Sequence, residues 1–236
     1  MWWHDAVKPW WFELIQSGSV VVDVGAHIGD TVAAFAEKVG PTGHVYAIEP
    51  GPKLFVHLVE RTHTLTHVDA YRLAISDENR KHRTVVHWGD FTLLDWDAPS
   101  AKNWEHISHP AQDIALKEVF MVSFITLDEF VAWFVDKKID WLKIDVDGGE
   151  GSVIRGAMKV LKEHHPSILI EIGYETMARL YDHPLELLTR LEGLGYRFWD
   201  PYERVQYTLE GVLHHIHRNG FNGANDFVCL HTTREN

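Results

Sequence analysis

Short apolar runs alternate with helix-like segments between residues 20 and 76, and this alternation limits most strongly how the chain can fold. Strand-length runs occur at VVVDV (20–24), HVYAIE (44–49) and AYRLAIS (70–76). TVAAFAEKV (31–39) places its apolar side chains at helical spacing, and LFVHLVERT (54–62) predicts a second helix. The order strand, helix, strand, helix, strand predicts a parallel sheet with helices on both faces.

The rhythm breaks after residue 80 and resumes near residue 127. RTVVHWG (83–89) and EVFMVSFI (118–125) are strand-like, whereas residues 91–116 predict a loop, so we expect an insertion with antiparallel character at about 80–125. Further helices are expected at 127–138, 151–165 and 185–195, and further strands at 141–146, 167–172, 196–200 and 226–232. Residues 18–236 are therefore expected to form one α/β domain.

An aromatic N-terminal appendage, residues 1–17, precedes this domain. MWWHDAVKPWWFEL predicts a short helix that packs its indoles on the body of the protein, with a lid or a dimer contact as the alternative. It lacks a basic region followed by a long apolar stretch, so no signal peptide is expected. No run approaches the roughly 20 apolar residues of a membrane helix. Cys229 is the single cysteine, which fits a reducing compartment, and we expect a cytoplasmic protein.

The charge balance argues against nucleic acid as a partner. The chain has 34 acidic and 22 basic residues, a formal net charge of −12. Broad binding to phosphate backbones needs a basic surface instead.

The first predicted strand ends in DVGAHIGD, residues 23–30, where a parallel sheet binds ligands. A dinucleotide fingerprint would need glycine at His27 and Asp30, so a pyrophosphate is poorly supported, and Asp23 suits an ammonium better than a phosphate. Glu49 ends the second strand, where a carboxylate can accept hydrogen bonds from both ribose hydroxyls. This leaves NAD open, but no tyrosine is followed four residues later by the lysine of a short-chain dehydrogenase.

Six blocks in order resemble the FkbM-type methyltransferases: DVGAHIGDTVAAFA, VYAIEP, LAISDE, ITLDEF, LKIDVDGGEGSVIRGA and ILIEI. The resemblance spans roughly residues 18–231. It implies S-adenosylmethionine as cofactor and the class I methyltransferase fold, a Rossmann-like, doubly wound and mostly parallel seven-stranded sheet with strand order 3-2-1-4-5-7-6. It also implies methylation of a hydroxyl on a sugar or another small molecule or natural product.

The resemblance also assigns residues to the cofactor. It implies that the methionine and ribose parts are surrounded by Asp23, Gly25, Ala26 and Gly29. Glu49 would bind the ribose diol, and Pro50 would shape the adjoining turn. Ala74 and Ile75 would flank the adenine. His27 stands where the family usually has Asn, and Asp147 where it usually has Glu. Asp23, Glu49 and Asp145 would offset the positive charges of the cofactor.

Three acids in IDVDGGE, residues 144–150, raise the question of a metal or of acid–base chemistry. An alignment with the EF-hand calcium loop would put Lys143 at its first position and Ile154 at its last, so a calcium loop is rejected. No metal is expected in this site, and a divalent ion is the alternative. Asp145 is the best candidate near the reacting methyl group, to bind the cofactor ammonium, hold the acceptor hydroxyl or act as base. Asp147 is expected to turn the chain, and Glu150 either to begin a helix or to act in the site.

Two other side chains are further candidates for the chemistry. Glu171 ends the fifth strand at the same rim, and His27 lies in the cofactor loop, so each could contact the acceptor or serve as base. His87 is a weaker candidate base. The remaining histidines have no positioned carboxylate and are expected at the surface rather than on a metal.

The function expected from the sequence is O-methylation of a small-molecule or glycan acceptor. An NAD-dependent oxidoreductase and a non-catalytic nucleotide-binding protein are the alternatives. A homo-oligomer formed through the tryptophan-rich N-terminus is a further expectation.

Overall fold

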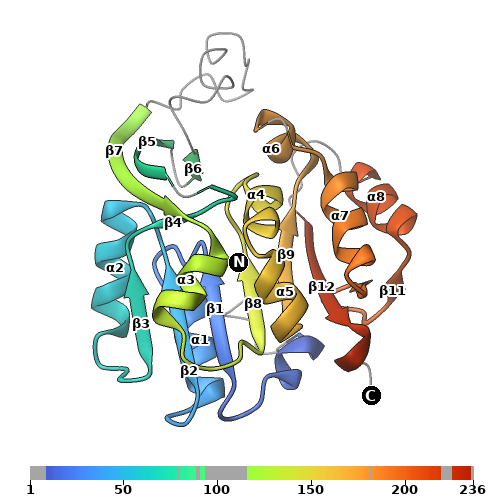
Figure 1. Ribbon diagram of the computed structural model, residues 1–236, viewed down its shortest axis with the longest axis horizontal. Helices are drawn as coiled ribbons and strands as arrows, with labels where there is room; N and C mark the ends of the chain where they lie inside the picture. Colours follow the sequence, from blue (N-terminus) through green and yellow to red (C-terminus); the bar gives the residue numbers. More distant parts are fainter. Residues whose placement is uncertain are drawn as a thin grey trace.

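Eight strands form the main sheet, in the order β11-β10-β12-β9-β8-β1-β2-β3 (Figure 1). The computed structural model describes residues 9–78, 80–88, 91–93, 116–180, 182–218 and 225–234. The strands of this sheet are β1 Val20–Val24, β2 His44–Ile48, β3 Val68–Tyr71, β8 Trp141–Ile144, β9 Ser167–Ile172, β10 Tyr196–Trp199, β11 Gln206–Tyr207 and β12 Asn225–His231. Seven of them have the order expected for a class I methyltransferase, and β11 is added at the edge.

Most of this sheet is parallel, as predicted. β3, β2, β1, β8 and β9 pair in parallel, whereas β12 runs antiparallel between β9 and β10. The carboxyl ends of the parallel strands therefore meet at one edge of the sheet, which is where ligands bind in such folds.

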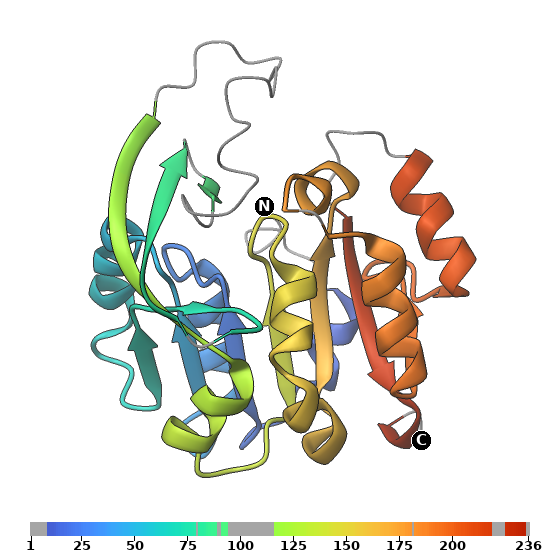
Figure 2. The same ribbon diagram turned by 45° about the horizontal axis from the view of Figure 1, so that its top comes forward.

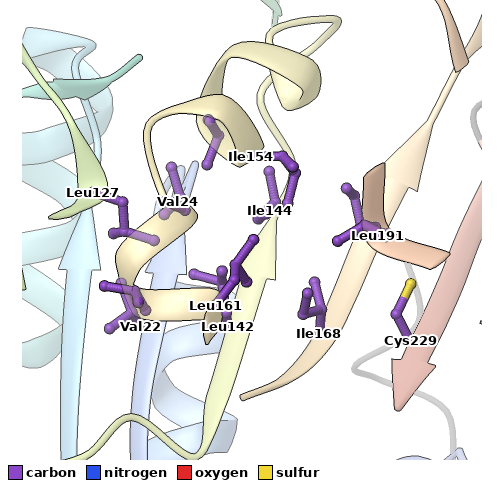
Figure 3. Packing of buried hydrophobic residues seen from close by; sticks show 14 of the residues in the cluster. Val22, Val24, Leu127, Leu142, Ile144, Ile154, Leu161, Ile168, Leu191 and Cys229 are labelled. Atoms are coloured by element: carbon purple, nitrogen blue, oxygen red, sulfur yellow. The ribbon is translucent and has the colours of Figure 1, made fainter. Parts of the chain in front are cut away.

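Helices cover both faces of the sheet. One face carries η1 Trp10–Leu14, α1 Asp30–Val39 and α2 Pro52–Thr62. The other carries α3 Leu127–Phe134, α4 Glu150–Arg155, α5 Met158–His164, α7 Pro184–Gly193 and α8 Leu209–Arg218. Figure 3 shows this second core, where Val22, Leu142 and Ile168 from neighbouring strands meet Leu161 and Leu191 from the helices.

A second sheet, in the order β4-β7-β5-β6, extends from the end of the molecule where α6 Tyr174–Arg179 also lies (Figure 2). Its strands are β4 Ala74–Ile75, β5 Arg80–Trp88, β6 Phe91–Leu93 and β7 Leu116–Ile125. The β5–β6 and β5–β7 pairs are antiparallel, which confirms the expected character of the insertion. Residues 91–93 were predicted as part of a loop but pair with β5, and residues 94–115 of that predicted loop lie outside the described residues.

Three predicted elements are wrong in their extent. The helix expected at 127–138 ends at Phe134. The run 70–76 is not one strand: β3 pairs with β2 as far as Tyr71, and Ala74 and Ile75 then pair with Phe124 and Ile125 in the second sheet. Segment 151–165 is two helices, α4 and α5, which separate at Gly156. A Cβ on Gly156 would lie 2.1 Å from the Ser76 carbonyl oxygen, so the chain is held against β4 at this point.

Within the N-terminal appendage, the described residues 9–17 pack on the body of the protein, as the preferred interpretation predicted. Trp11 is 2% exposed and lies among Phe12, Phe35 and Trp141. Trp2 and Trp3 lie outside the described residues. Within the part of the chain that the structure describes, no helix has the length and apolar character needed to cross a bilayer.

Candidate active site

The ends of β2, β1 and β8 are fastened together by the turn at Gly25. The backbone N–H groups of Gly25 and Ala26 both donate to the Ile48 carbonyl oxygen at 3.0 Å. Gly25 has φ +86°, and a Cβ there would lie 1.7 Å from the carbonyl oxygen of Asp145. Only glycine permits this approach, so the turn brings three strand ends to one place.

Glu49 follows β2 and is 3% exposed. Its Oε2 accepts a hydrogen bond from the His27 backbone N–H at 2.9 Å, and its Oε1 accepts one from the Gly51 backbone N–H at 2.7 Å. Burial raises the pKa of this carboxyl group to about 7, against the opposing effect of the two N–H donors. The side chain is therefore fixed in place, and each oxygen keeps a lone pair for a ligand.

His27 contributes to this arrangement through its backbone. Its φ of +51° lies in the left-handed region and aims its N–H at Glu49, while its side chain is exposed. The other loop residues build the turn itself: Ala26 is buried, and Gly29 precedes α1 with φ +86°. Pro50 leads into Gly51 and α2.

Asp23 was expected on the rim of the pocket, but the structure places it beneath the rim. The side chain is 0% exposed, accepts a hydrogen bond from the Thr31 hydroxyl group, and lies 3.2 Å from the Lys143 ammonium nitrogen. Its charge is therefore neutralised inside the protein, because β1 directs residue 23 toward the α1 face of the sheet.

Lys143 is a buried residue of the candidate site that the sequence reasoning missed. Its buried Nζ contacts Asp23 Oδ1 at 3.2 Å, Asp145 Oδ2 at 3.1 Å and the Gly25 carbonyl oxygen at 3.4 Å. Burial disfavours its charged form, but Asp145 and Asp23 outweigh burial and raise the pKa of the ammonium group. The available signal was a lysine inside the apolar run WLKIDV, and the structure places it in register with Asp23 on the neighbouring β1.

The loop after Asp145 is held by Glu150. Asp147 has φ +55°, which confirms that it turns the chain, and α4 begins at Glu150 as predicted. Glu150 is 1% exposed, and its Oε1 accepts hydrogen bonds from the N–H groups of Val146 and Gly148, each at 3.1 Å. Its carboxyl group, whose pKa burial raises to about 7, is thus a buried support for the loop.

We expect replacement of Glu150 by Ala to destabilise the protein by about 1–3 kcal/mol, because two buried N–H groups lose their acceptor. Glu150→Gln should cost less, since the amide oxygen can still accept both hydrogen bonds. Urea unfolding of both variants measures the difference, with the exposed Glu192→Ala as control. Equal stability of the Ala and Gln variants would argue against this support role.

Three carboxyl groups approach one another beside Lys143. One oxygen each from Asp145, Asp147 and Glu171 lie within 4.8 Å of one another, a spacing that would permit a shared cation. Burial, followed by the charges of Asp145 and Asp226, raises the pKa of Glu171 to about 9. Asp226 was also missed: it lies directly opposite Glu171 in the β9–β12 pair. The absence of a metal stays a prediction.

The residues assigned to the adenine lie in an unexpected strand. Ala74 and Ile75 are 4% and 3% exposed and belong to β4, not to a continuous third strand of the main sheet. Their contact with adenine stays a prediction. His87 lies in β5. Among the described residues, no histidine belongs to a group spaced to hold a metal.

Comparison with known proteins places the chain among methyltransferases. Residues 23–198 match the family described as "Methyltransferase FkbM domain". The 2-O-methyltransferase NoeI of Sinorhizobium fredii is 26% identical over 146 residues, which cover 60% of this chain and 58% of that protein. A crystal structure of the methyltransferase FkbM from Methylobacillus flagellatus shares the fold with TM-score 0.50 at 15% identity, over 91% of this chain and 44% of that one. The chain thus corresponds to about half the length of these relatives.

Proposed function

The chain belongs to the FkbM methyltransferase family, whose cofactor is S-adenosylmethionine, and from this premise we propose that it methylates a hydroxyl group of a sugar or another small molecule. The observation that carries the proposal is the set of three strand ends joined at Gly25, with the fixed carboxyl group of Glu49 beside them. The 2-O-methyltransferase NoeI supports oxygen as the atom that receives the methyl group.

The residues present fit the cofactor. Glu49 keeps one free lone pair on each oxygen, which suits the two ribose hydroxyls. The turn at Gly25, Ala26 and Gly29 would lie under the methionine part, with Asp145 facing its positive charges. Pro50 would border the ribose, and Ala74 and Ile75 would contact the adenine. Asp23 would act from below through Lys143 rather than by direct contact.

S-adenosylmethionine supplies an electrophilic methyl group on a sulfonium. Transfer is an in-line displacement, so alignment of the acceptor oxygen with the methyl carbon provides much of the rate. The oxygen–carbon bond forms as the sulfur–carbon bond breaks, and the hydroxyl proton passes to a basic side chain. A general base contributes typically 10²–10⁴-fold.

Asp145, Glu171 and His27 are the side chains proposed for the acceptor and its proton. Asp145 is paired with Lys143 at 3.1 Å, which favours a positioning role because the ion pair holds its carboxylate in one place. Glu171 shows no ion pair within the described part of the chain and is the stronger candidate base. Because its pKa is raised to about 9, only its deprotonated fraction can accept the proton, and that fraction increases with pH. His27 has an exposed side chain on the cofactor loop and is the alternative.

Isothermal titration with S-adenosylhomocysteine tests this proposal. We expect binding with one site per chain, no binding of NADH, and slow turnover of S-adenosylmethionine when hydroxylated acceptors are added. Binding of NADH without S-adenosylhomocysteine would favour an oxidoreductase. Cofactor binding with no turnover across a broad acceptor panel would point to a non-catalytic nucleotide-binding protein.

A further inference from the structure

A cleft opens beside Asp145 on the face of the main sheet that carries η1 and α1. Four charged side chains form its polar end: Lys143, Asp145, Glu171 and Asp226. Its less polar walls include Trp11, Leu169, Pro201 and Tyr202. Of the residues proposed to bind the cofactor, only Asp145 borders this cleft. The cleft therefore adjoins the cofactor site and offers room for a second ligand.

The polar end presents two carboxyl groups with unused acceptor oxygens. Glu171 on β9 and Asp226 on β12 are direct partners in an antiparallel pair, so their side chains lie on the same face as neighbours. Within its described residues, the structure shows no hydrogen bond or ion pair to either carboxyl group. Lys143, in contrast, is held by Asp23 and Asp145. The Glu171–Asp226 pair is thus available to a ligand.

Another part of the lining is a fixed turn that carries an exposed aromatic ring. Tyr202 is 48% exposed, and the Asp200 carboxylate accepts hydrogen bonds from the N–H groups of Tyr202 and Glu203, both at 2.7 Å. The indole N–H of Trp10 donates to the Asp200 carbonyl oxygen at 2.8 Å. The turn and the N-terminal segment are therefore joined, which fixes the backbone that carries Tyr202.

We propose that this cleft is the acceptor site, in which Asp226 and Glu171 accept hydrogen bonds from the hydroxyls of a saccharide ring that lies against Tyr202. The inference rests on the proposed function and assigns the acceptor-binding residues. A saccharide offers hydroxyls at its edge and C–H groups on its face, which suits a cleft lined by carboxyl groups and an aromatic ring. The competing class is an acceptor that carries an ammonium group, because three carboxyl groups line the polar end and Lys143 is already paired with Asp23 and Asp145.

Binding of methyl pyranosides to the protein saturated with S-adenosylhomocysteine tests this site. The probes are the methyl glycosides of glucose, galactose, mannose, fucose and rhamnose, observed by saturation-transfer NMR. We expect a signal from at least one of them. Asp226→Asn and Tyr202→Ala should each weaken binding about tenfold or more, while the affinity for S-adenosylhomocysteine stays unchanged. Glu203→Gln, next to Tyr202 but outside the cleft, should behave as the wild type.

Three results would overturn the inference. They are the absence of any pyranoside signal in protein that binds S-adenosylhomocysteine, unchanged pyranoside binding in both cleft variants, and binding of primary amines in place of pyranosides. Tyr202→Ala keeps the test valid if Asp226→Asn fails to fold, because Tyr202 is an exposed side chain. Failure to bind S-adenosylhomocysteine would instead reject the proposed function, and this inference with it.

Discussion

Glu49→Ala is expected to weaken binding of S-adenosylhomocysteine by about 100-fold or more. Hydrogen bonds to a charged group contribute about 1.5–3 kcal/mol, and this carboxylate would accept two from the ribose. The substitution also removes the acceptor of the His27 and Gly51 N–H groups, which shape the loop around the ribose. Glu49→Gln keeps one acceptor oxygen and should have an intermediate affinity.

The same residue predicts a pH dependence. Because burial raises the pKa of Glu49 to about 7, its carboxylate fraction increases between pH 6 and 8, and the affinity of the wild type should increase over that range. The Gln variant should lose this dependence. Isothermal titration at several pH values measures both effects, with Glu60→Gln on the exposed side of α2 as control. Unchanged affinity in Glu49→Ala would remove the ribose role.

Lys143→Met should produce the largest loss of stability, about 3–5 kcal/mol. Removal of one partner from a buried ion pair leaves the other charge uncompensated, and Asp23 is 0% exposed. Asp145 and the Gly25 carbonyl oxygen lose their contact in the same variant. We therefore expect turnover to decrease strongly even at temperatures where the variant is folded.

A double-mutant cycle separates the charge effect from the loss of packing. The double variant Lys143→Met, Asp23→Asn should be more stable than Lys143→Met alone, since no buried charge remains in the pair. Urea unfolding of the four proteins gives the coupling free energy. A single variant that loses less than about 1 kcal/mol, or a double variant no more stable than the single one, would contradict the role given to Lys143.

The main sheet could be predicted because its strands and helices carry local signals. Val20–Val24 and His44–Ile48 are apolar runs that end at Gly25 and Glu49, and α1 has one apolar face. The order of the blocks then indicated the family and the strand order. The division of 151–165 had no such signal, because the Asp128 carboxylate on α3 accepts hydrogen bonds from the N–H groups of Lys159 and Val160 and so supports the start of α5.

The missed elements share a cause. α6, YETMAR, has only six residues, and three of the ten residues of α8 are histidines. Their helical structure depends on contacts with other segments, as at Gly148, where a Cβ would lie 2.3 Å from the Thr176 carbonyl oxygen.

The sequence predicted which residues lie near the candidate site, but not how deeply each side chain is buried. Glu49 lies at the strand end where we expected it, whereas Asp23 is covered and Lys143 takes up its charge. The sequence places Asp23, Glu49 and Asp145 at the ends of three strands. It does not show that Asp23 faces the interior, in register with Lys143 on the neighbouring strand. Asp226 became a candidate only through its pairing with Glu171, which is distant in sequence.

A crystal structure of the complex with S-adenosylhomocysteine tests the central claim most directly. The account predicts both ribose hydroxyls within hydrogen-bond distance of the Glu49 carboxyl group, with the amino-acid part of the ligand over the turn at Gly25 and next to Asp145. A ligand bound elsewhere, or a ribose turned away from Glu49, would contradict the account.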